Sequence, residues 1–276
     1  MDKAAFHPST REHLDNFLKS PSHALCLVGP QGAGKGYAAS LVAGELLGKT
    51  AGDALYHLGE DEAGIGIEQI RALQQFLRLK KPGHAATRRM VIIENAQNMS
   101  GEAQNALLKT LEEPPADAVF ILTTDGSATL RSTIYSRVQS VHIMPLSLDQ
   151  ATEYFGNKPG LAKFYHLSGG YAGLLYALLN DPEHHLVEAV EQAKGIIRST
   201  SYERLLLVDG LAKQKESLPT LLYALQRVAG ALLAGTTDAA KLKRLTATRR
   251  AIYQAELDSS KSANTKLLLT DLFLNL

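Results

Sequence analysis

The hydrophobic and polar positions of the chain follow one rhythm in its first half and another in its second. In the first half, short apolar runs of strand length alternate with stretches in which apolar residues recur at helical spacing. The predicted strands cover residues 24–28, 54–58, 90–93, 118–123 and 141–144. Strands that alternate with helices are typical of a parallel sheet with helices on both faces, so the pattern predicts an α/β domain.

Helices are expected between these strands and before the first one. The helical stretches cover residues 37–47, 67–79 and 101–113, and Pro114-Pro115 stops the last of them. Ahead of the first strand, Ser9 and Glu12 have the spacing of a capping box. This spacing predicts a first helix that begins near Ser9.

From Pro145 onward the pattern is helical and shows no further strand. The predicted helices cover residues 148–155, 160–167, 170–179, 183–198, 201–215, 218–234, 238–258 and 262–275. Glycine, asparagine and proline separate the first short ones. This change predicts a small helical domain followed by a larger helical bundle.

A glycine-rich loop follows the first predicted strand and opens the next helix. The loop reads GPQGAGKG over residues 29–36, close to the phosphate-binding pattern GxxxxGK[ST]. Gly29, Gly34 and Lys35 stand where the pattern requires them, and Gly32 adds backbone freedom. Gly36 stands where a serine or threonine hydroxyl would bind magnesium. The sequence therefore predicts a phosphate cradle without its metal ligand, although a plain strand-to-helix turn would also be rich in glycine.

A second departure lies at the end of the third predicted strand. Glu94 follows the apolar run directly, where nucleotide hydrolases of this type place an acidic residue that holds the magnesium ion. The next position, where a carboxylate would polarise the attacking water, is Asn95. Because an amide cannot act as a general base, hydrolysis is expected to be crippled.

Composition and charge narrow the class of protein. The chain has 276 residues, 45% hydrophobic and 21% charged, which is ordinary for a globular protein of two or three domains. Lys and Arg total 29 against 28 Asp and Glu, a formal net charge of +1. A protein that bound nucleic acid alone through many phosphate contacts would be more basic, so contact with DNA is expected to be local or made within an assembly.

The single cysteine and the lack of long apolar runs indicate the cellular compartment of the protein. Cys26 lies in a predicted buried strand, and one cysteine cannot form an intrachain disulfide or a cysteine-rich metal site. No apolar run approaches the length of a bilayer, and the first residues lack the apolar core of a secretory signal. We expect a cytoplasmic protein without a membrane partner.

A basic cluster precedes the third predicted strand. It consists of Arg78, Lys80, Lys81, Arg88 and Arg89. These side chains could contact phosphates, but a run of charges is more often a solvated surface, which we favour.

Several motifs together resemble one family over nearly the whole chain. They are GPQGAGKG (29–36), IGIEQIR (65–71), MVIIENAQNMS (90–100), ALLKTLEEPP (106–115), FILTT (120–124), TIYSRVQ (133–139) and SANTKLLLTDLFLNL (262–276). The chain resembles the AAA+ clamp-loader family of bacterial DNA polymerase III, and within it the delta-prime type. This resemblance implies an AAA+ P-loop-type α/β domain (1–145), a small helical lid domain (146–182) and an all-α collar domain (183–276) that assembles subunits into a ring.

The resemblance also shows which catalytic parts are missing. ATPase members of the family carry Thr or Ser at Gly36 and an Asp-Glu pair at Glu94-Asn95. They also carry an arginine in the lid, close to the place of Gly173, and many relatives hold zinc with four cysteines. The expected cofactors follow: no metal, and ATP or ADP only without a productively placed magnesium ion.

One catalytic part remains. Arg137 falls on the arginine of the family's Ser-Arg-Cys motif, with Val138 in place of the cysteine. The resemblance implies that Arg137 acts in trans, on the nucleotide of a neighbouring subunit, and a guanidinium suits that role because it stays charged. A structural surface arginine is the alternative.

Three hypotheses follow for function. The first is a non-hydrolysing subunit that works with gamma/tau-type ATPase subunits and a delta subunit to load the sliding clamp onto primer-template DNA. The second is a gamma-type subunit that hydrolyses ATP itself, with Glu94 on the metal. The third is a free-standing adaptor that keeps a decayed loop as scaffold.

The apolar faces of the last helices leave two interpretations open. Candidate residues are Leu205, Leu206, Leu221, Leu222, Leu225 and Leu232. Each could pack in the collar against other subunits or belong to the core of a plain bundle, because both roles need an apolar helical face.

Overall fold

The structure is a computed structural model that describes residues 4–48, 54–59, 64–78, 89–126, 129–181, 184–259 and 264–276. The chain divides into two compact units. The first consists of Met1–Gly156 with Tyr171–Leu174, and the second of Asn157–Gly170 with Leu175–Leu276. The three-domain division at residues 145 and 182 stays a prediction.

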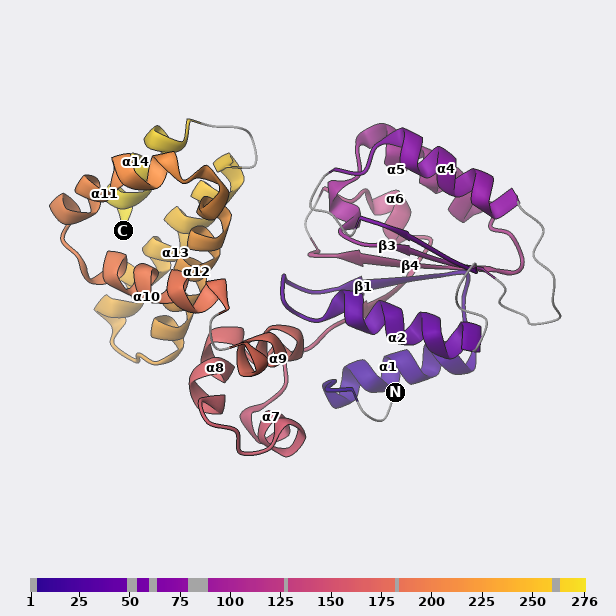
Figure 1. Ribbon diagram of the computed structural model, residues 1–276, viewed down its shortest axis with the longest axis horizontal. Coiled ribbons are helices and arrows are strands. Elements are labelled where there is room, and N and C mark those ends of the chain that lie inside the picture. The colour runs from indigo at the N-terminus through magenta and orange to yellow at the C-terminus, as the bar shows by residue number, and fades with distance from the viewer. Residues whose placement is uncertain are drawn as a thin grey trace. The chain divides into compact units, whose positions relative to one another are not determined.

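The first unit is built on a five-stranded sheet in which every pairing is parallel (Figure 1). The strands are β1 (Ala24–Val28), β2 (Leu55–Leu58), β3 (Arg89–Ile93), β4 (Ala118–Thr124) and β5 (Gln139–His142). Their order is β2-β3-β4-β1-β5. The predicted α/β fold with a parallel sheet is therefore confirmed.

Helices cover both faces of this sheet, as Figure 1 shows. On one face lie α1 (Pro8–Lys19) and α2 (Lys35–Leu47), and on the other α4 (Ile67–Arg78), α5 (Gly101–Glu112) and the short α6 (Ser132–Tyr135). Successive strand residues point to opposite faces, so Leu25 and Leu27 pack under the first pair while Cys26 and Val28 pack under the second group. A short 3-10 helix, η2 (Ala96–Asn98), connects β3 to the α5 segment.

The last strand begins and ends two residues earlier than predicted. Strand β5 covers Gln139–His142 instead of 141–144. It is an edge strand with mostly exposed side chains, and its register is set by backbone pairing of Gln139 with Leu25. A search for apolar runs selects the more hydrophobic residues that follow and misses the polar start of such a strand.

The predicted capping box of the first helix is wrong. Helix α1 begins at Pro8, and the cap is His7, whose side chain accepts a hydrogen bond from the Ser9 N–H. Proline fits the first helical position because that position needs no N–H donor. Ser9 therefore lies inside the helix.

The interpretation of the basic cluster is also corrected in part. Arg89 is buried at the start of β3, pairs with Asp117 and donates to the Leu77 carbonyl. It is a structural residue and belongs to no charged surface. Arg78 is exposed, and Lys80, Lys81 and Arg88 lie outside the described residues.

The remaining chain is helical, as predicted. After α7 (Leu148–Phe155) of the first unit, the helices are α8 (Leu161–Ser168), α9 (Ala172–Asn180), α10 (His185–Arg198), α11 (Ser201–Lys213), η3 (Lys215–Ser217), α12 (Leu218–Ala234), α13 (Ala239–Ser259) and α14 (Thr265–Asn275). Between His142 and the last residue, the described segments contain no strand. Within those segments no helix combines the length and apolar character needed to cross a membrane.

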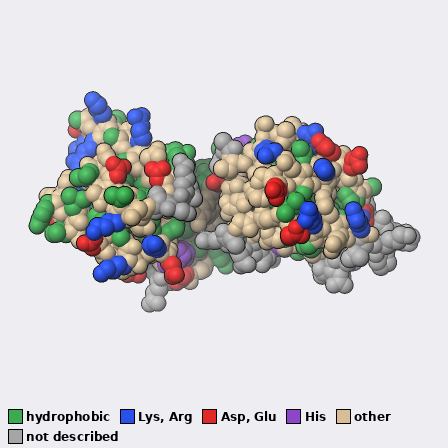
Figure 2. All heavy atoms as spheres, turned by 90° about the horizontal axis from the view of Figure 1, so that it is seen from above, with side chains coloured by type: hydrophobic (Ala, Val, Ile, Leu, Met, Phe, Trp, Pro, Cys, Tyr) green, Lys and Arg blue, Asp and Glu red, His purple; other side chains and the backbone are tan. Residues whose placement is uncertain are grey.

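The candidate leucines of the helical unit separate into two groups. Leu221, Leu222 and Leu225 are buried in the core of the bundle. Leu205, Leu206 and Leu232 are exposed, and so are Tyr202 (73%) on α11 and Leu267 (69%) on α14. Figure 2 shows hydrophobic side chains of this unit at its surface, in green on the left, among Lys and Arg side chains. Three of the candidates are thus core residues, and the other three remain open to a partner.

A buried threonine fastens α1 to the edge strand. Thr10 Oγ1 donates to the carbonyl of His142 at 3.0 Å and accepts from the N–H of Met144 at 3.0 Å. Its side chain is fully buried. The hydroxyl thus satisfies two backbone groups where the chain leaves the sheet.

Replacing Thr10 with valine keeps the side-chain shape and removes both hydrogen bonds. We expect the free energy of unfolding to fall by about 1–3 kcal/mol, because backbone groups are left unpaired in a buried place. The measurement is urea unfolding followed by circular dichroism, since the chain has no tryptophan. Thr10→Ser, which keeps the hydroxyl, is the control, and a valine variant as stable as the parent would contradict the assignment.

Candidate functional site

The glycine-rich loop lies at the carboxyl edge of the parallel sheet. It leaves β1, whose neighbours are β4 on one side and β5 on the other. The Gly29 N–H donates to the Thr124 carbonyl at 3.0 Å, and the Ile143 N–H donates to the Val28 carbonyl at 2.8 Å. Open parallel sheets bind ligands where consecutive connections leave a strand in opposite directions. The loop therefore occupies the position where this fold would bind a phosphate.

Two glycines shape the loop. Gly32 has a φ of 76° and Gly34 a φ of 89°, a left-handed region that residues with a Cβ rarely adopt. Helix α2 begins directly afterwards at Lys35. The backbone thus keeps the shape of a phosphate cradle.

The lysine of the loop is turned back onto the loop itself. Lys35 Nζ donates to the carbonyl oxygens of Gly29 and Pro30 at 2.7 and 2.9 Å, and the residue is only 9% exposed. Burial lowers the pKa of Lys35, and the charges of Asp125 and Glu94 oppose that shift. The ammonium group is thus already bound by the chain's own carbonyls.

Glu94 fills the space that a metal-binding hydroxyl would need. A Cβ added at Gly36 would lie 2.8 Å from both carboxylate oxygens of Glu94. The carboxylate is held by His57, whose Nε2 lies 3.0 Å from Oε1. A magnesium ligand at position 36 and Glu94 in this position exclude each other.

His57 is a residue of this site that sequence reasoning missed. It lies on β2 opposite Ile92 of β3, one residue before each strand ends. The parallel register therefore brings its ring to the carboxylate of Glu94 at the sheet edge. The sequence contains no signal for this pairing, because it depends on which two strands are neighbours.

Asn95 completes the strand end by its backbone. It has a φ of 51°, the one left-handed non-glycine residue in the part of the chain that the structure describes. Its N–H donates to Thr123 Oγ1 at 3.0 Å. Asparagine tolerates this conformation better than most residues, so a structural role accounts for it where a catalytic carboxylate would otherwise stand.

The segment Tyr171–Leu174, which belongs to the first unit, lies directly on the loop. The Leu174 N–H donates to the Gly32 carbonyl at 2.7 Å. A Cβ added at Gly173 would lie 2.7 Å from both Cα and N of Gly34. Gly173 thus lets the two backbones touch. It lies close to the position where ATPase relatives are expected to have their lid arginine.

The residues of this site do not fit a magnesium–nucleotide complex in this arrangement. Lys35 is bound to the loop's carbonyls, Glu94 and His57 hold each other beside Gly36, and Leu174 is hydrogen-bonded to Gly32. A phosphate in the cradle would have to displace these contacts. The two charged side chains of the site, Lys35 and Glu94, thus already have partners within the protein.

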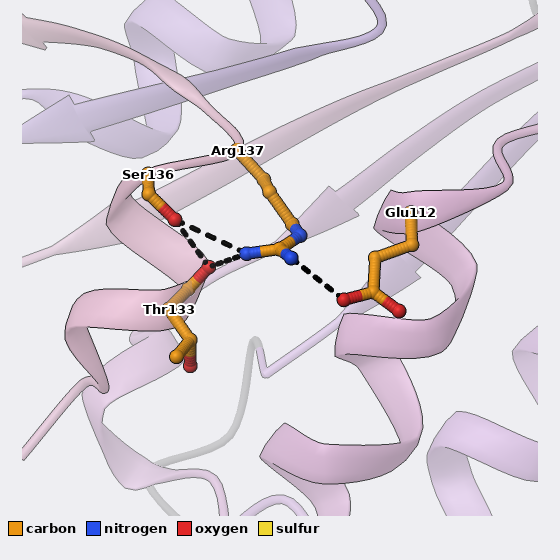
Figure 3. A network of polar contacts seen from close by, with 4 residues as sticks. All are labelled: Glu112, Thr133, Ser136 and Arg137. Carbon is orange, nitrogen blue, oxygen red and sulfur yellow. Dashed lines mark hydrogen bonds and ion pairs between the residues drawn. The ribbon is translucent and has the colours of Figure 1, made fainter.

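Arg137 forms a separate network, shown in Figure 3. Its Nη1 donates to the Thr133 carbonyl at 3.0 Å and to Ser136 Oγ at 3.2 Å. Its Nη2 forms an ion pair with Glu112 Oε1 at 2.7 Å, and the two side chains are 35% and 44% exposed. Glu112 comes from the end of α5, and the other partners come from α6 and the residue after it. The guanidinium is thus held at the surface by two elements.

An open pocket of about 560 Å³ lies against this network. Its lining residues are Ser22, His23, Leu111, Glu112, Ser136, Arg137, Val138 and Gln139. The Nε2 atom of His23 is buried and has no hydrogen-bond partner among the described residues. The pocket therefore presents polar groups, including a guanidinium, to whatever occupies it.

The fold places Arg137 and the glycine-rich loop at opposite ends of the strands. Arg137 lies where the parallel strands begin, and the loop lies where they end. Arg137 precedes β5, whose first residue pairs with Leu25 near the start of β1, whereas the loop begins after Val28 at the end of β1. A strand rises about 3.3 Å per residue, so the length of β1 separates them. The sequence predicted both groups, and the structure does not bring them together.

Comparisons with known proteins agree with this fold and its motifs. A family model described as DNA polymerase III, delta subunit, matches residues 49–147. The delta' subunit of DNA polymerase III from Haemophilus influenzae is 34% identical over 94 residues, which is 34% of this chain and 28% of that protein. The delta' subunit from Pseudomonas aeruginosa is 32% identical over 176 residues, 54% of this chain and 53% of that protein.

One further relative and one solved structure extend the similarity. The replication factor C small subunit of Halobacterium salinarum is 26% identical over 212 residues, 76% of this chain and 65% of that protein. The chain thus spans from 28% to 65% of the length of these three curated relatives. A solved structure of a DNA polymerase III gamma subunit-related protein from Thermotoga maritima superposes with a TM-score of 0.50 at 20% identity, covering 95% of this chain and 97% of that one. This last likeness shows a shared fold.

Replacing Gly173 with alanine should loosen the segment from the loop. The added Cβ meets backbone of Gly34, which cannot move aside as a side chain could, so we expect a penalty of about 1–3 kcal/mol on this contact. Hydrogen exchange of the Leu174 N–H should then be about 5- to 150-fold faster.

The matched control is Gly44→Ala, an exposed position inside α2 where an added Cβ meets nothing within 4 Å. It should leave exchange at Leu174 unchanged and, as a helix-interior glycine, gain about 0.5–1 kcal/mol in stability. Unaltered exchange at Leu174 in the Gly173 variant would contradict the described contact.

Proposed function

Because the chain belongs to the DNA polymerase III clamp-loader family, we propose that it is a non-hydrolysing subunit of the delta-prime type. In this proposal it works in the cytoplasm with gamma/tau-type ATPase subunits and a delta subunit. The assembly places a sliding clamp on primer-template DNA, and this chain supplies Arg137 to the nucleotide of a neighbour.

The observation that carries the proposal is that the charged side chains of the glycine-rich site, Lys35 and Glu94, already have partners within the protein. Lys35 binds the loop's own carbonyls, and Leu174 donates to Gly32. The carboxylate of Glu94 lies where a hydroxyl on residue 36 would reach a metal. Hydrolysis needs a bound metal ion and a positioned water, and this arrangement supports neither.

The location of Arg137 supports action on another subunit. The guanidinium lies at the amino edge of the sheet beside an open pocket, with the loop at the carboxyl edge of the same sheet. A side chain cannot span that separation, so Arg137 is of no use to its own loop. At a subunit boundary, its permanent charge could stabilise the charge that develops on a neighbour's terminal phosphate.

Exposed apolar side chains on the helical unit support membership of an assembly. Leu206 and Tyr202 on α11 are 65% and 73% exposed, and Leu267 is exposed on α14, a helix that packs against α11. Large apolar side chains gathered at a surface are typical of sites that another protein covers. This favours a subunit over a free-standing adaptor.

A measurement of ATP hydrolysis separates the non-hydrolysing subunit from the gamma-type alternative. The purified chain with Mg–ATP should show no turnover above background, and Lys35→Ala should change nothing, because Lys35 is engaged with Gly29 and Pro30. Phosphate release in a coupled assay is the measurement. Steady turnover that Lys35→Ala abolishes would establish the gamma-type alternative instead.

The second prediction concerns the trans arginine. In a loader reconstituted with its ATPase subunits, clamp and primed DNA, Arg137→Ala should lower turnover at the site it serves by about 10³- to 10⁵-fold, the range seen for such arginines. Turnover of the whole assembly should fall by less, because its other sites continue to work.

Arg131→Ala is the matched control, since it removes a nearby exposed arginine that contacts Asn105. It should leave turnover and clamp loading unaltered. Equal activity of the Arg137→Ala variant and the parent chain would contradict the proposed trans role of Arg137.

A further inference from the structure

Glu112 is the one charged group that contacts Arg137 among the described residues. Its Oε1 lies 2.7 Å from Nη2, while Nη1 is held separately by the Thr133 carbonyl and Ser136 Oγ (Figure 3). The two ends of the guanidinium thus have different partners. One end is fixed to its own segment, and the other is bound by a carboxylate from α5.

Glu112 lies at an electrostatically unfavourable end of its helix. It is the last residue of α5, where the helix dipole disfavours a negative charge. Pro114-Pro115 follow and prevent the helix from continuing. The carboxylate is therefore presented at a defined place, and Arg137 is the cation that compensates it.

The ion pair with Glu112 neutralises the positive charge of Arg137, which would otherwise attract a nucleotide. A triphosphate that approaches the open pocket meets a guanidinium already bound to the carboxylate of Glu112. The phosphate repels this carboxylate and has to displace it before it can bind Nη2. Both side chains are more than a third exposed, so solvent weakens their attraction and displacement is easy. The contacts of Nη1 would survive the exchange and keep the side chain in place.

We propose that the carboxylate of Glu112 competes with the terminal phosphate of a nucleoside triphosphate for Nη2 of Arg137. The inference rests on the proposed trans role of Arg137. Because Glu112 must leave Nη2 before a phosphate can bind there, the competition raises the triphosphate concentration needed to engage the guanidinium.

The test is Glu112→Gln in the reconstituted loader with clamp and primed DNA, with turnover measured against ATP concentration. The quantity compared is the Arg137-dependent part of turnover, obtained by subtracting the same complex carrying Arg137→Ala. Removing the competitor should lower the half-saturating ATP concentration by about 1.5- to 5-fold, the range for an exposed ion pair. The maximal rate should not change, because the pair is already broken in the nucleotide-bound state.

Glu113→Gln is the matched control, because Glu113 is the next residue, carries the same charge and has no ion pair with Arg137 in the described structure. It should leave both kinetic parameters unchanged. High salt should shrink the difference between Glu112→Gln and the parent chain, since screening weakens an exposed pair.

Two failures can be told apart. If Arg137→Ala itself leaves turnover unaltered, the proposed trans role fails and the competition fails with it. If Arg137→Ala lowers turnover but Glu112→Gln leaves half-saturation unchanged, raises it or lowers the maximal rate, only the competition is overturned. A loss of both binding and rate would mean that Glu112 positions the guanidinium instead of competing for it.

Discussion

The glycine-rich loop of the first unit is held by a backbone contact between two distant segments. The Leu174 N–H donates to the Gly32 carbonyl, and Gly173 lies against Gly34 without a side chain between them. Glycine at these positions has two physical effects: it allows left-handed backbone in the loop and it lets two chains approach to backbone contact. The same freedom that would open a cradle for phosphate here allows the chain to close it.

Electrostatics at the loop follow from this closure. A buried ammonium group needs acceptors, and Lys35 donates to the carbonyls of Gly29 and Pro30. In the same way, Glu94 takes His57 as its partner where a hydrolase would take a metal ion. Two charged residues of a nucleotide site, Lys35 and Glu94, are thus still present, and each has a partner within the protein.

The parallel sheet separates the two sets of candidate residues. All strands run in one direction, so segments that follow strands gather at one edge and segments that precede them gather at the other. The loop belongs to the first edge, and Ser22, His23 and Arg137 belong to the second. In such a fold, the groups at one edge can change without altering the groups at the other.

The sequence alone determined those features that depend on local pattern. Apolar runs and helical spacing predicted the parallel α/β unit and the helical remainder, and motif spacing identified the loop, Gly36 and Arg137, because each depends on neighbours in the chain. Only the tertiary structure decided what these groups contact. The His57–Glu94 pair, the closure by Gly173 and Leu174, and the Arg137–Glu112 ion pair join residues far apart in sequence. Such pairings are set by strand order and helix packing, for which the residues themselves carry no local signal.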